Sequence, residues 1–453
     1  MVQRNTGEPK RLKIRHIFLA LLLILLVWLV FYRVTAHRDL RRRVGELRAQ
    51  GYPMNLEELN RSYDLPAGAD NAADFYVTAF SRYVEWDSEA REGVPWVGKG
   101  KRLSRTESLE VSILERSERF LSDNSETLSL LHEAVGSEHC RYPVDLTDTS
   151  DANMEWLPRV RRSAFLLCLE ALVACERDDP NQAMRSIHAN LALARSVNAP
   201  ILIHRLVRIA VEALAYGNIE RVLSRMSLGD EQLQTLSGWL AADDDEAGCQ
   251  QVFAGERCFG LEAFRGSGGQ HPAHEGTGGK VLRLINIPRK LLGLHDRDML
   301  GYINQLQDCI EAADFSAENE MAGGGLIGRI PKEDKGGGLL TRLLSPAFTR
   351  IFQLEVRRIA GQRVAQTALA VERYRLAEGR VPRMLSDLVP VYLEAVPKDP
   401  FDGQDLRYDV LASGYVVYSV GVDLSDDGGA EKEDRKRGGR GEARWDVTFV
   451  VER

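Results

Sequence analysis

The sequence predicts a mainly α-helical protein with an N-terminal transmembrane helix, an α-helical bundle or hairpin domain, and a small C-terminal α+β module with an antiparallel sheet. Three observations support this fold class. One long apolar run, residues 17–32, stands near the N-terminus. Apolar residues recur at helical spacing between residues 155 and 241. The last part of the chain combines one helical pattern with three short segments rich in β-branched and aromatic residues.

Composition narrows the function classes. The chain has 453 residues, of which 44% are hydrophobic and 28% charged, which suits two or three domains with buried cores. Its net charge of −7 and dispersed basic residues argue against a dedicated nucleic-acid-binding protein. None of the 6 cysteines forms a Cys-x-x-Cys pair, so a zinc ribbon or thioredoxin-type site is not expected.

The N-terminus predicts a membrane anchor. Residues 1–16 form a basic segment, and residues 17–34 are expected to be the transmembrane helix. The unbroken run of 17–32 would span about 24 Å, short of the ~30 Å hydrocarbon core, but Arg15 and Arg33 can snorkel to the interfaces. The alternative is a cleaved signal peptide with its cleavage site at residues 34–36. Basic residues flank both sides, so the charge count does not decide the orientation.

Residues 35–322 are expected to form the α-helical domain. Its densest part contains helical patterns over 156–176, 183–197 and 201–223. The turn at 177–181, with Pro180 at a helix start, resembles the turn of one tetratricopeptide unit, but no 34-residue recurrence is visible. Helical hairpins that pack as a bundle are therefore the expectation.

A Gly-rich linker, residues 323–344, is expected before a C-terminal module of residues 345–453. The module begins with a helix that stops before Gly379 and Pro382, because Pro cannot continue a helix. Turn residues follow, and the predicted strands are Leu406–Leu411, Tyr415–Val420 and Trp445–Val451.

The order of short motifs in this module carries a resemblance. The motifs are Tyr374-Arg375, the turn 379–382, the Val-Pro-x-Asp-Pro segment 396–400, the Ser-x-Gly-x-Asp loop 419–429, and Asp446-Val447. In this order they resemble the C-terminal region of type II secretion major pseudopilins, and the whole chain resembles uncharacterised bacterial membrane-anchored proteins. The resemblance implies a secretion- or pilus-associated role, in which a single-pass protein of the bacterial inner membrane holds its C-terminal part in the periplasm.

The resemblance also implies calcium in the acidic loop between the last two strands. Calcium prefers six to eight oxygen ligands, and carboxylates with neutral oxygens supply them. The alternative is a solvated acidic turn. The residues expected to contribute are Asp423, Asp426, Asp427, Asp446 and Ser419. No other cofactor is expected.

Motifs for catalysis are weak. Residues 276–280 have Gly and Lys but lack the spacing of a phosphate-binding loop, and His132-Glu133 lacks the second histidine of a zinc-protease helix. The leading hypothesis is a membrane-tethered, non-enzymatic envelope protein whose helical domain binds protein partners, without a nucleic-acid partner or an identified small-molecule substrate. The alternative is a membrane-tethered hydrolase whose active site in the helical domain has no local motif.

Overall fold

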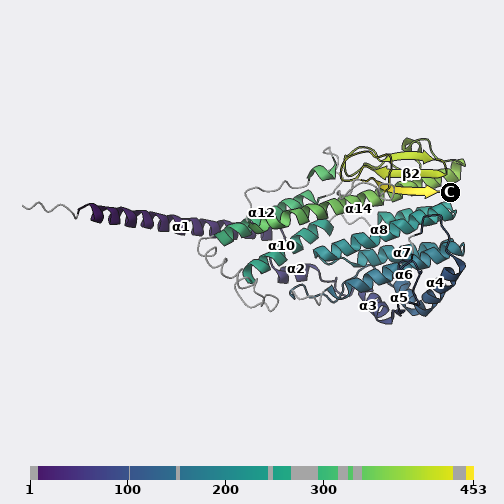
Figure 1. Cartoon of the computed structure of the whole chain (residues 1–453), viewed down its shortest axis with the longest axis horizontal. Helices are drawn as coiled ribbons and strands as arrows, with labels where there is room; N and C mark the ends of the chain where they lie inside the picture. Colours follow the sequence, from purple (N-terminus) through teal and green to yellow (C-terminus); the bar gives the residue numbers. More distant parts are fainter. Residues whose placement is uncertain are drawn as a thin grey trace, which may run out of the picture.

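The computed structural model describes residues 9–100, 103–148, 154–242, 248–266, 294–314, 325–329, 339–431 and 445–453. A single helix, α1, projects like a stalk from one end of a helical body, and the C-terminal sheet lies toward the opposite end (Figure 1). The mainly helical fold with a small antiparallel sheet is confirmed.

The helices follow one another along most of the chain. They are α1 (Pro9–Ala49), α2 (Leu56–Ser62), α3 (Ala72–Arg82), α4 (Val111–Asp123), α5 (Ser125–Glu133), η1 (Ala134–Gly136), α6 (Leu157–Glu176), α7 (Pro180–Ser196), α8 (Leu202–Arg225), α9 (Asp230–Ala241), α10 (Gly248–Gly266), α12 (Leu294–Ala312), η4 (Leu326–Arg329), α14 (Leu339–Glu378) and η5 (Leu385–Leu388). The strands are β1 (Arg407–Leu411), β2 (Gly414–Ser419) and β3 (Val447–Glu452).

Helix α1 forms the projecting stalk with its N-terminal part and packs in the body with its C-terminal part. Among the described residues, α1 is the one helix long and apolar enough to cross a membrane. It does not stop after the expected span of 17–34 but continues to Ala49. Leu40 and Leu47, on its last turns, are buried against α12. The apolar segment is therefore joined rigidly to the body, without a loop between them.

Helices α6, α7 and α8 form the expected hairpins. Asp179 caps α7 by accepting a hydrogen bond from the Gln182 N–H at 2.9 Å, and Pro180 occupies the first helical turn, where its missing N–H costs nothing. Asp178 takes a positive φ of 54°, which turns the chain between α6 and α7. The three helices pack on one another in every pair, and α6 lies in the interior, where nearly every residue from Leu166 to Cys175 is buried.

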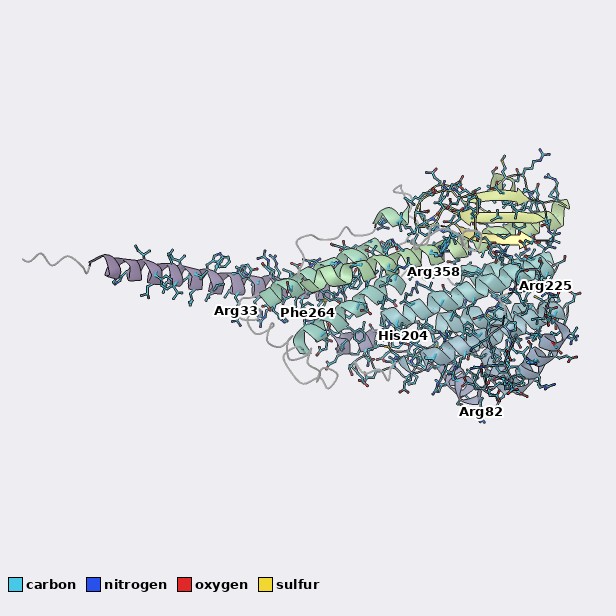
Figure 2. All side chains as sticks on the ribbon, viewed as in Figure 1. Arg33, Arg82, His204, Arg225, Phe264 and Arg358 are labelled. Carbon is cyan, nitrogen blue, oxygen red and sulfur yellow. The ribbon has the colours of Figure 1, made fainter. Side chains whose placement is uncertain are left out.

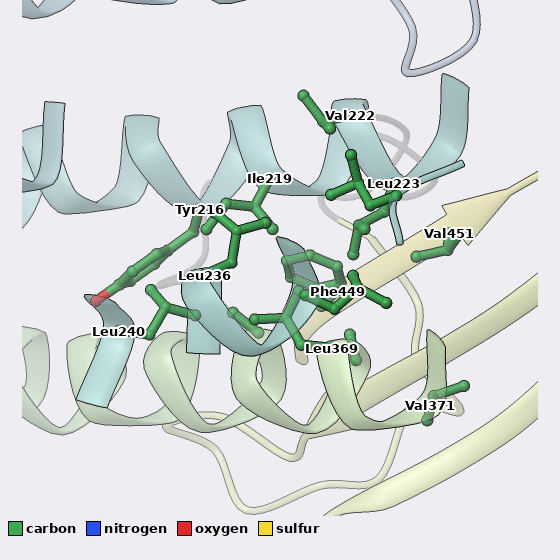
Figure 3. Close-up of a cluster of buried hydrophobic side chains, with 14 of the residues drawn as sticks. Tyr216, Ile219, Val222, Leu223, Leu236, Leu240, Leu369, Val371, Phe449 and Val451 are labelled. Carbon is green, nitrogen blue, oxygen red and sulfur yellow. The ribbon is translucent and has the colours of Figure 1, made fainter. Parts of the chain in front are cut away.

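Helix α14 contacts both the helical body and the C-terminal sheet. Its 40 residues pack on α8, α9 and α12 and then on strands β2 and β3. Its first half buries Phe352 and Val356 in one apolar core with α10 and α12. Its second half buries Leu369 and Val371 in a second core with α8, α9 and the sheet. Figure 3 shows this second core, in which Phe449 of β3 approaches Leu369 and the side chains of α8.

The three strands form one antiparallel sheet in the order β1-β2-β3. The strands occur within two residues of the predicted segments at either end. The outer edge of β3 is covered by α8, because the Val450 N–H donates to the Glu220 carboxylate at 2.6 Å and the Glu452 N–H donates to Ser224 Oγ at 3.2 Å. The sheet is thus attached to the helical body by its edge as well as its face.

The structure describes two parts of the expected linker, residues 325–329 and 339–344. Residues 325–329 pack against the C-terminal part, where the Leu326 N–H donates to the Pro400 carbonyl at 2.7 Å and Leu326 is buried. Gly325 has a φ of +73°, and a Cβ there would lie 2.0 Å from the Phe401 carbonyl oxygen, so only glycine fits. Residues 339–344 belong to α14, while 323–324 and 330–338 lie outside the described residues. The body and the C-terminal part share a core, because α14 runs through both.

Candidate functional site

The acidic loop, residues 419–431, is anchored by a buried aspartate of the Val-Pro-x-Asp-Pro motif, to which the sequence alone assigned no role in a site. Asp399 is fully buried, and its carboxylate oxygens accept hydrogen bonds from Ser419 Oγ at 2.8 Å and from the Val420 N–H at 2.9 Å. The Phe401 N–H and Arg407 Nη1 complete the set at 2.9 and 2.7 Å. Donors on every side satisfy the charge of the carboxylate, so Asp399 fixes where the loop leaves β2.

From this anchor the loop folds back over the outer face of the sheet. Gly428 and Gly429 both have positive φ, of 69° and 73°. A Cβ on Gly429 would lie 3.2 Å from side-chain atoms of both Tyr418 and Val416, so the backbone runs directly on these β2 residues. The paired glycines therefore allow the close approach that brings the loop back to β3.

Asp446, just before β3, is the most unusual residue of the site. It is 2% exposed, and its Oδ2 accepts a hydrogen bond from the Gly429 N–H at 2.8 Å. Its Oδ1 is buried and has no hydrogen-bond partner among the described residues. Burial raises the pKa of Asp446, and the carboxylates of Asp427 and Asp426 raise it further, against the lowering by backbone N–H donors of Gly429 and Asp427. A buried acceptor beside two like charges is a position where a cation would be stabilising.

The structure divides the predicted calcium ligands into two groups. Asp426, Asp427 and Asp446 are close enough for their charges to interact. Ser419 Oγ instead donates to Asp399, and the exposed Asp423 accepts a hydrogen bond from the Ser425 N–H at 3.2 Å within its own turn. Among the residues that the structure describes, no three His, Cys, Asp or Glu side chains form a group ready to hold a metal ion. Calcium binding stays a prediction, and residues 432–444, the insertion before Asp446, lie outside the described residues.

The far end of the loop is held by Arg105, which sequence reasoning did not single out. Arg105 Nη1 donates to Glu431 Oε2 at 3.0 Å, its Nη2 contacts the other oxygen, and its Nε lies 3.0 Å from Glu220 Oε2. Glu452 of β3 is 3.8 Å away. One guanidinium therefore connects the segment before α4 with α8, β3 and the acidic loop.

A second polar group lies in the helical body, on α5, α6 and α7. His132 Nε2 is 2.9 Å from Glu170 Oε2, and Ser186 Oγ donates to the same oxygen at 2.7 Å. In a nucleophile–base pair the histidine would contact the serine, whereas here the carboxylate separates them. Ser186 is also fully buried and donates to the Gln182 carbonyl at 2.9 Å. The arrangement suits a structural hydrogen-bond group that joins three helices.

A group of five buried charged residues joins α8 to α14, and we call it the α8–α14 joint (Arg205, Arg208, Glu212, Glu355 and Arg358). Glu355 is fully buried and accepts hydrogen bonds from Arg205 at 2.6 and 2.8 Å and from Arg358 at 2.6 Å. Burial alone would raise the pKa of Glu355, but the guanidiniums of Arg205 and Arg358 lower it to about 2. Arg208 donates to Glu212 at 2.6 Å, and Glu212 also lies 3.7 Å from Arg358. Opposite charges alternate here, which is the arrangement of a structural joint.

Comparison with known proteins adds no relative. No protein family, curated protein or solved structure matches this chain.

Proposed function

We propose that this chain is a single-pass protein of the bacterial inner membrane, anchored by α1, which holds its body in the periplasm and acts by binding proteins rather than by catalysis. The observation that carries the proposal is the apolar stretch of α1. Most of its large apolar side chains between Ile17 and Val34 are exposed, and the buried residues of the same helix, Ala36, Leu40 and Leu47, all follow this stretch. So large an apolar surface is stable only in contact with lipid or protein.

The continuity of α1 favours an anchor over a cleaved signal peptide. Cleavage at residues 34–36 would cut the helix immediately before Ala36 and Leu40, which are buried against the body. An uncut helix acts as a rigid spacer and fixes the distance between the membrane and the body.

We propose a link to secretion- or pilus-like assemblies from the order of the motifs in the C-terminal part. Its helix, turns and antiparallel strands follow the order of the pseudopilin motifs. Two of these motifs, residues 396–400 and 419–429, are connected through the hydrogen bonds that Asp399 accepts from Ser419 and Val420. We propose that the acidic loop takes calcium through Asp426, Asp427 and Asp446.

The non-enzymatic part of the proposal rests on the polar groups of the body. The buried Ser186 and the Glu170 carboxylate between it and His132 do not provide an accessible nucleophile with its base. In the α8–α14 joint, the Glu355 carboxylate is likewise occupied by hydrogen bonds from Arg205 and Arg358.

Alkaline carbonate extraction of membranes tests the anchor. We expect the full chain to stay in the pellet, and Leu22→Arg combined with Leu25→Arg to release it, because each charge at the centre of a membrane helix costs about 3 kcal/mol. The matched control is Val77→Arg, an exposed apolar residue of α3 outside the anchor. Extraction of the unaltered chain into the supernatant would contradict the proposal.

Crosslinking in native membranes tests the role. The full chain should capture the same protein partners in repeated experiments, and these should include components of a secretion or pilus assembly. A chain that instead crosslinks to no protein above the level of the released double variant would contradict a binding role.

A further inference from the structure

The base of the stalk carries arginines whose charge the protein leaves unbalanced. Arg33, Arg38 and Arg41 of α1 are exposed, and none of them lies within ion-pairing distance of a carboxylate among the described residues. Their neighbours differ, since Arg42 is 3.7 Å from both Asp39 and Glu46, and Arg48 is 2.9 Å from Glu58. Figure 2 shows Arg33 where the stalk meets the body.

A second helix brings another arginine to the same level. Arg297, in the first turn of α12, is exposed, and its guanidinium lies 5.1 Å from the centre of the Tyr32 ring. The adjacent Asp296 contacts His37 Nδ1 at 3.0 Å and so holds α12 beside α1. No carboxylate of the described residues pairs with Arg297. We call Arg33, Arg38, Arg41 and Arg297 the arginine collar.

The position of the collar follows from helix geometry. Trp28 and Tyr32 stack with ring centres 5.5 Å apart at the end of the apolar run, as aromatic residues do at a membrane interface. With a rise of 1.5 Å per residue, Arg38 and Arg41 lie about 9 and 14 Å beyond Tyr32 along the axis. Because Cα–Cβ bonds of a helix tilt toward its N-terminus, these side chains extend back toward the bilayer.

Two collar residues, Arg38 and Arg41, also face away from the body. At about 100° per residue, Arg38 lies roughly 160° and Arg41 roughly 100° around the helix from the buried Leu40. The body therefore covers neither of them, and both are free to reach headgroups.

We propose that the arginine collar binds anionic phospholipid headgroups, and this proposal rests on the membrane anchor proposed above. Guanidinium groups form paired hydrogen bonds with phosphate oxygens, and basic residues next to an anionic membrane surface favour its lipids by about fivefold each. Bound lipid supplies the negative charge that the surrounding side chains do not. The collar fixes the depth of the stalk and the height of the body above the bilayer.

The test uses the full chain in nanodiscs made from equal parts of phosphatidylglycerol and phosphatidylcholine, with bound lipids counted by native mass spectrometry. We expect phosphatidylglycerol to be retained over phosphatidylcholine. Replacement of all four collar arginines by Gln should lower this preference by about fivefold or more. Replacement of all four by Lys should keep most of the preference, because the charges remain. The control replaces four exposed arginines of the body by Gln: Arg82, Arg119, Arg177 and Arg185.

Three outcomes would overturn the proposal. They are equal retention of the two lipids by the unaltered chain, an equal loss of preference in the body control, and release of the bound lipid by an excess of inorganic phosphate, which would indicate a site for a free anion. Carbonate extraction is performed first on cell membranes that hold the same variants. A chain that is extracted has lost both the anchor and the collar, whereas a membrane-retained chain without lipid preference has lost only the collar.

Discussion

The α8–α14 joint and the acidic loop both bury carboxylates. The joint surrounds its carboxylate Glu355 with positive charges, whereas the loop places negative charges beside its carboxylate Asp446. In the joint, Glu355 accepts hydrogen bonds from two guanidiniums, which lower its pKa to about 2. In the loop, Asp446 is almost as buried, yet its nearest charged neighbours include the carboxylates of Asp426 and Asp427, and its pKa is raised. The comparison shows how the surroundings of a buried carboxylate separate a structural role from a candidate binding role.

Removing the carboxylate of the joint should produce the largest effect. Glu355→Ala leaves Arg205 and Arg358 buried without their shared partner, so we expect the free energy of unfolding to fall by about 3–5 kcal/mol. Chemical denaturation of the full chain in detergent measures this change. A loss of less than about 1 kcal/mol would mean that the joint does not depend on its charges.

Calcium should give the next largest effect, confined to the acidic loop. Calcium at a hundredfold excess over its Kd should stabilise the folded chain by about 2.7 kcal/mol and raise its melting temperature. Asp427→Asn and Asp446→Asn should each remove the rise, because these carboxylates lie together. Magnesium should do less, since its octahedral shell is less adaptable.

Two further variants make the calcium measurement specific. Asp405→Asn removes an exposed carboxylate that pairs with Lys398 outside the loop, and it should leave the calcium response intact. Asp423 belongs to the ligand set expected from the sequence, but it does not lie with Asp426, Asp427 and Asp446 in the structure. We therefore expect calcium to raise the melting temperature of Asp423→Asn as it does that of the unaltered chain. An identical melting curve with and without calcium would leave the loop as surface charge.

The pH dependence of stability should differ in sign between the two regions. Glu355 has a pKa lowered from 4.5, so its stabilising contribution is complete above pH 4.5 and is lost as pH falls toward about 2. Asp446 has a pKa raised from 3.8, so its ionisation costs stability at neutral pH, and the cost disappears as pH falls below that raised value toward 3.8. Glu355→Gln should therefore be most destabilising at neutral pH. Asp446→Asn should be most stabilising there, and parallel pH profiles for the two variants would contradict this contrast.

An exposed ion pair gives the smallest expected effect. Arg82 and Glu126 are 3.2 Å apart, with 56% and 64% of their side chains exposed. Glu126→Gln should change the free energy of unfolding by no more than about 1 kcal/mol, because water screens the pair. A loss as large as that of Glu355→Ala would show that burial does not distinguish the two pairs.

Local patterns in the sequence predicted the helices and strands better than the long-range side-chain contacts between them. The three strands and the end of α14 before Gly379 followed from β-branched segments and a helix stop. The start of α14 at Leu339 did not, because the preceding glycine runs suggested a linker that would extend to residue 344. Arg205 and Glu355 are 150 positions apart, so no local pattern connects them.

The candidate site shows the same limit. The resemblance singled out Asp446 and the paired glycines, and the structure brings Asp446 to Gly429. Asp399 stands in the Val-Pro-x-Asp-Pro motif, but its contact with Ser419 depends on how the sheet folds over it. Arg105 reaches Glu431 across most of the chain, and only three-dimensional packing reveals that contact.

Protease treatment of intact spheroplasts tests the central claim, that α1 anchors a body held in the periplasm. We expect added protease to degrade the part of the chain after residue 40 and to leave a short membrane-protected fragment that contains the apolar stretch of α1, residues 17–34. A body that survives in intact spheroplasts, and is cleaved only in inverted membrane vesicles, would contradict this account.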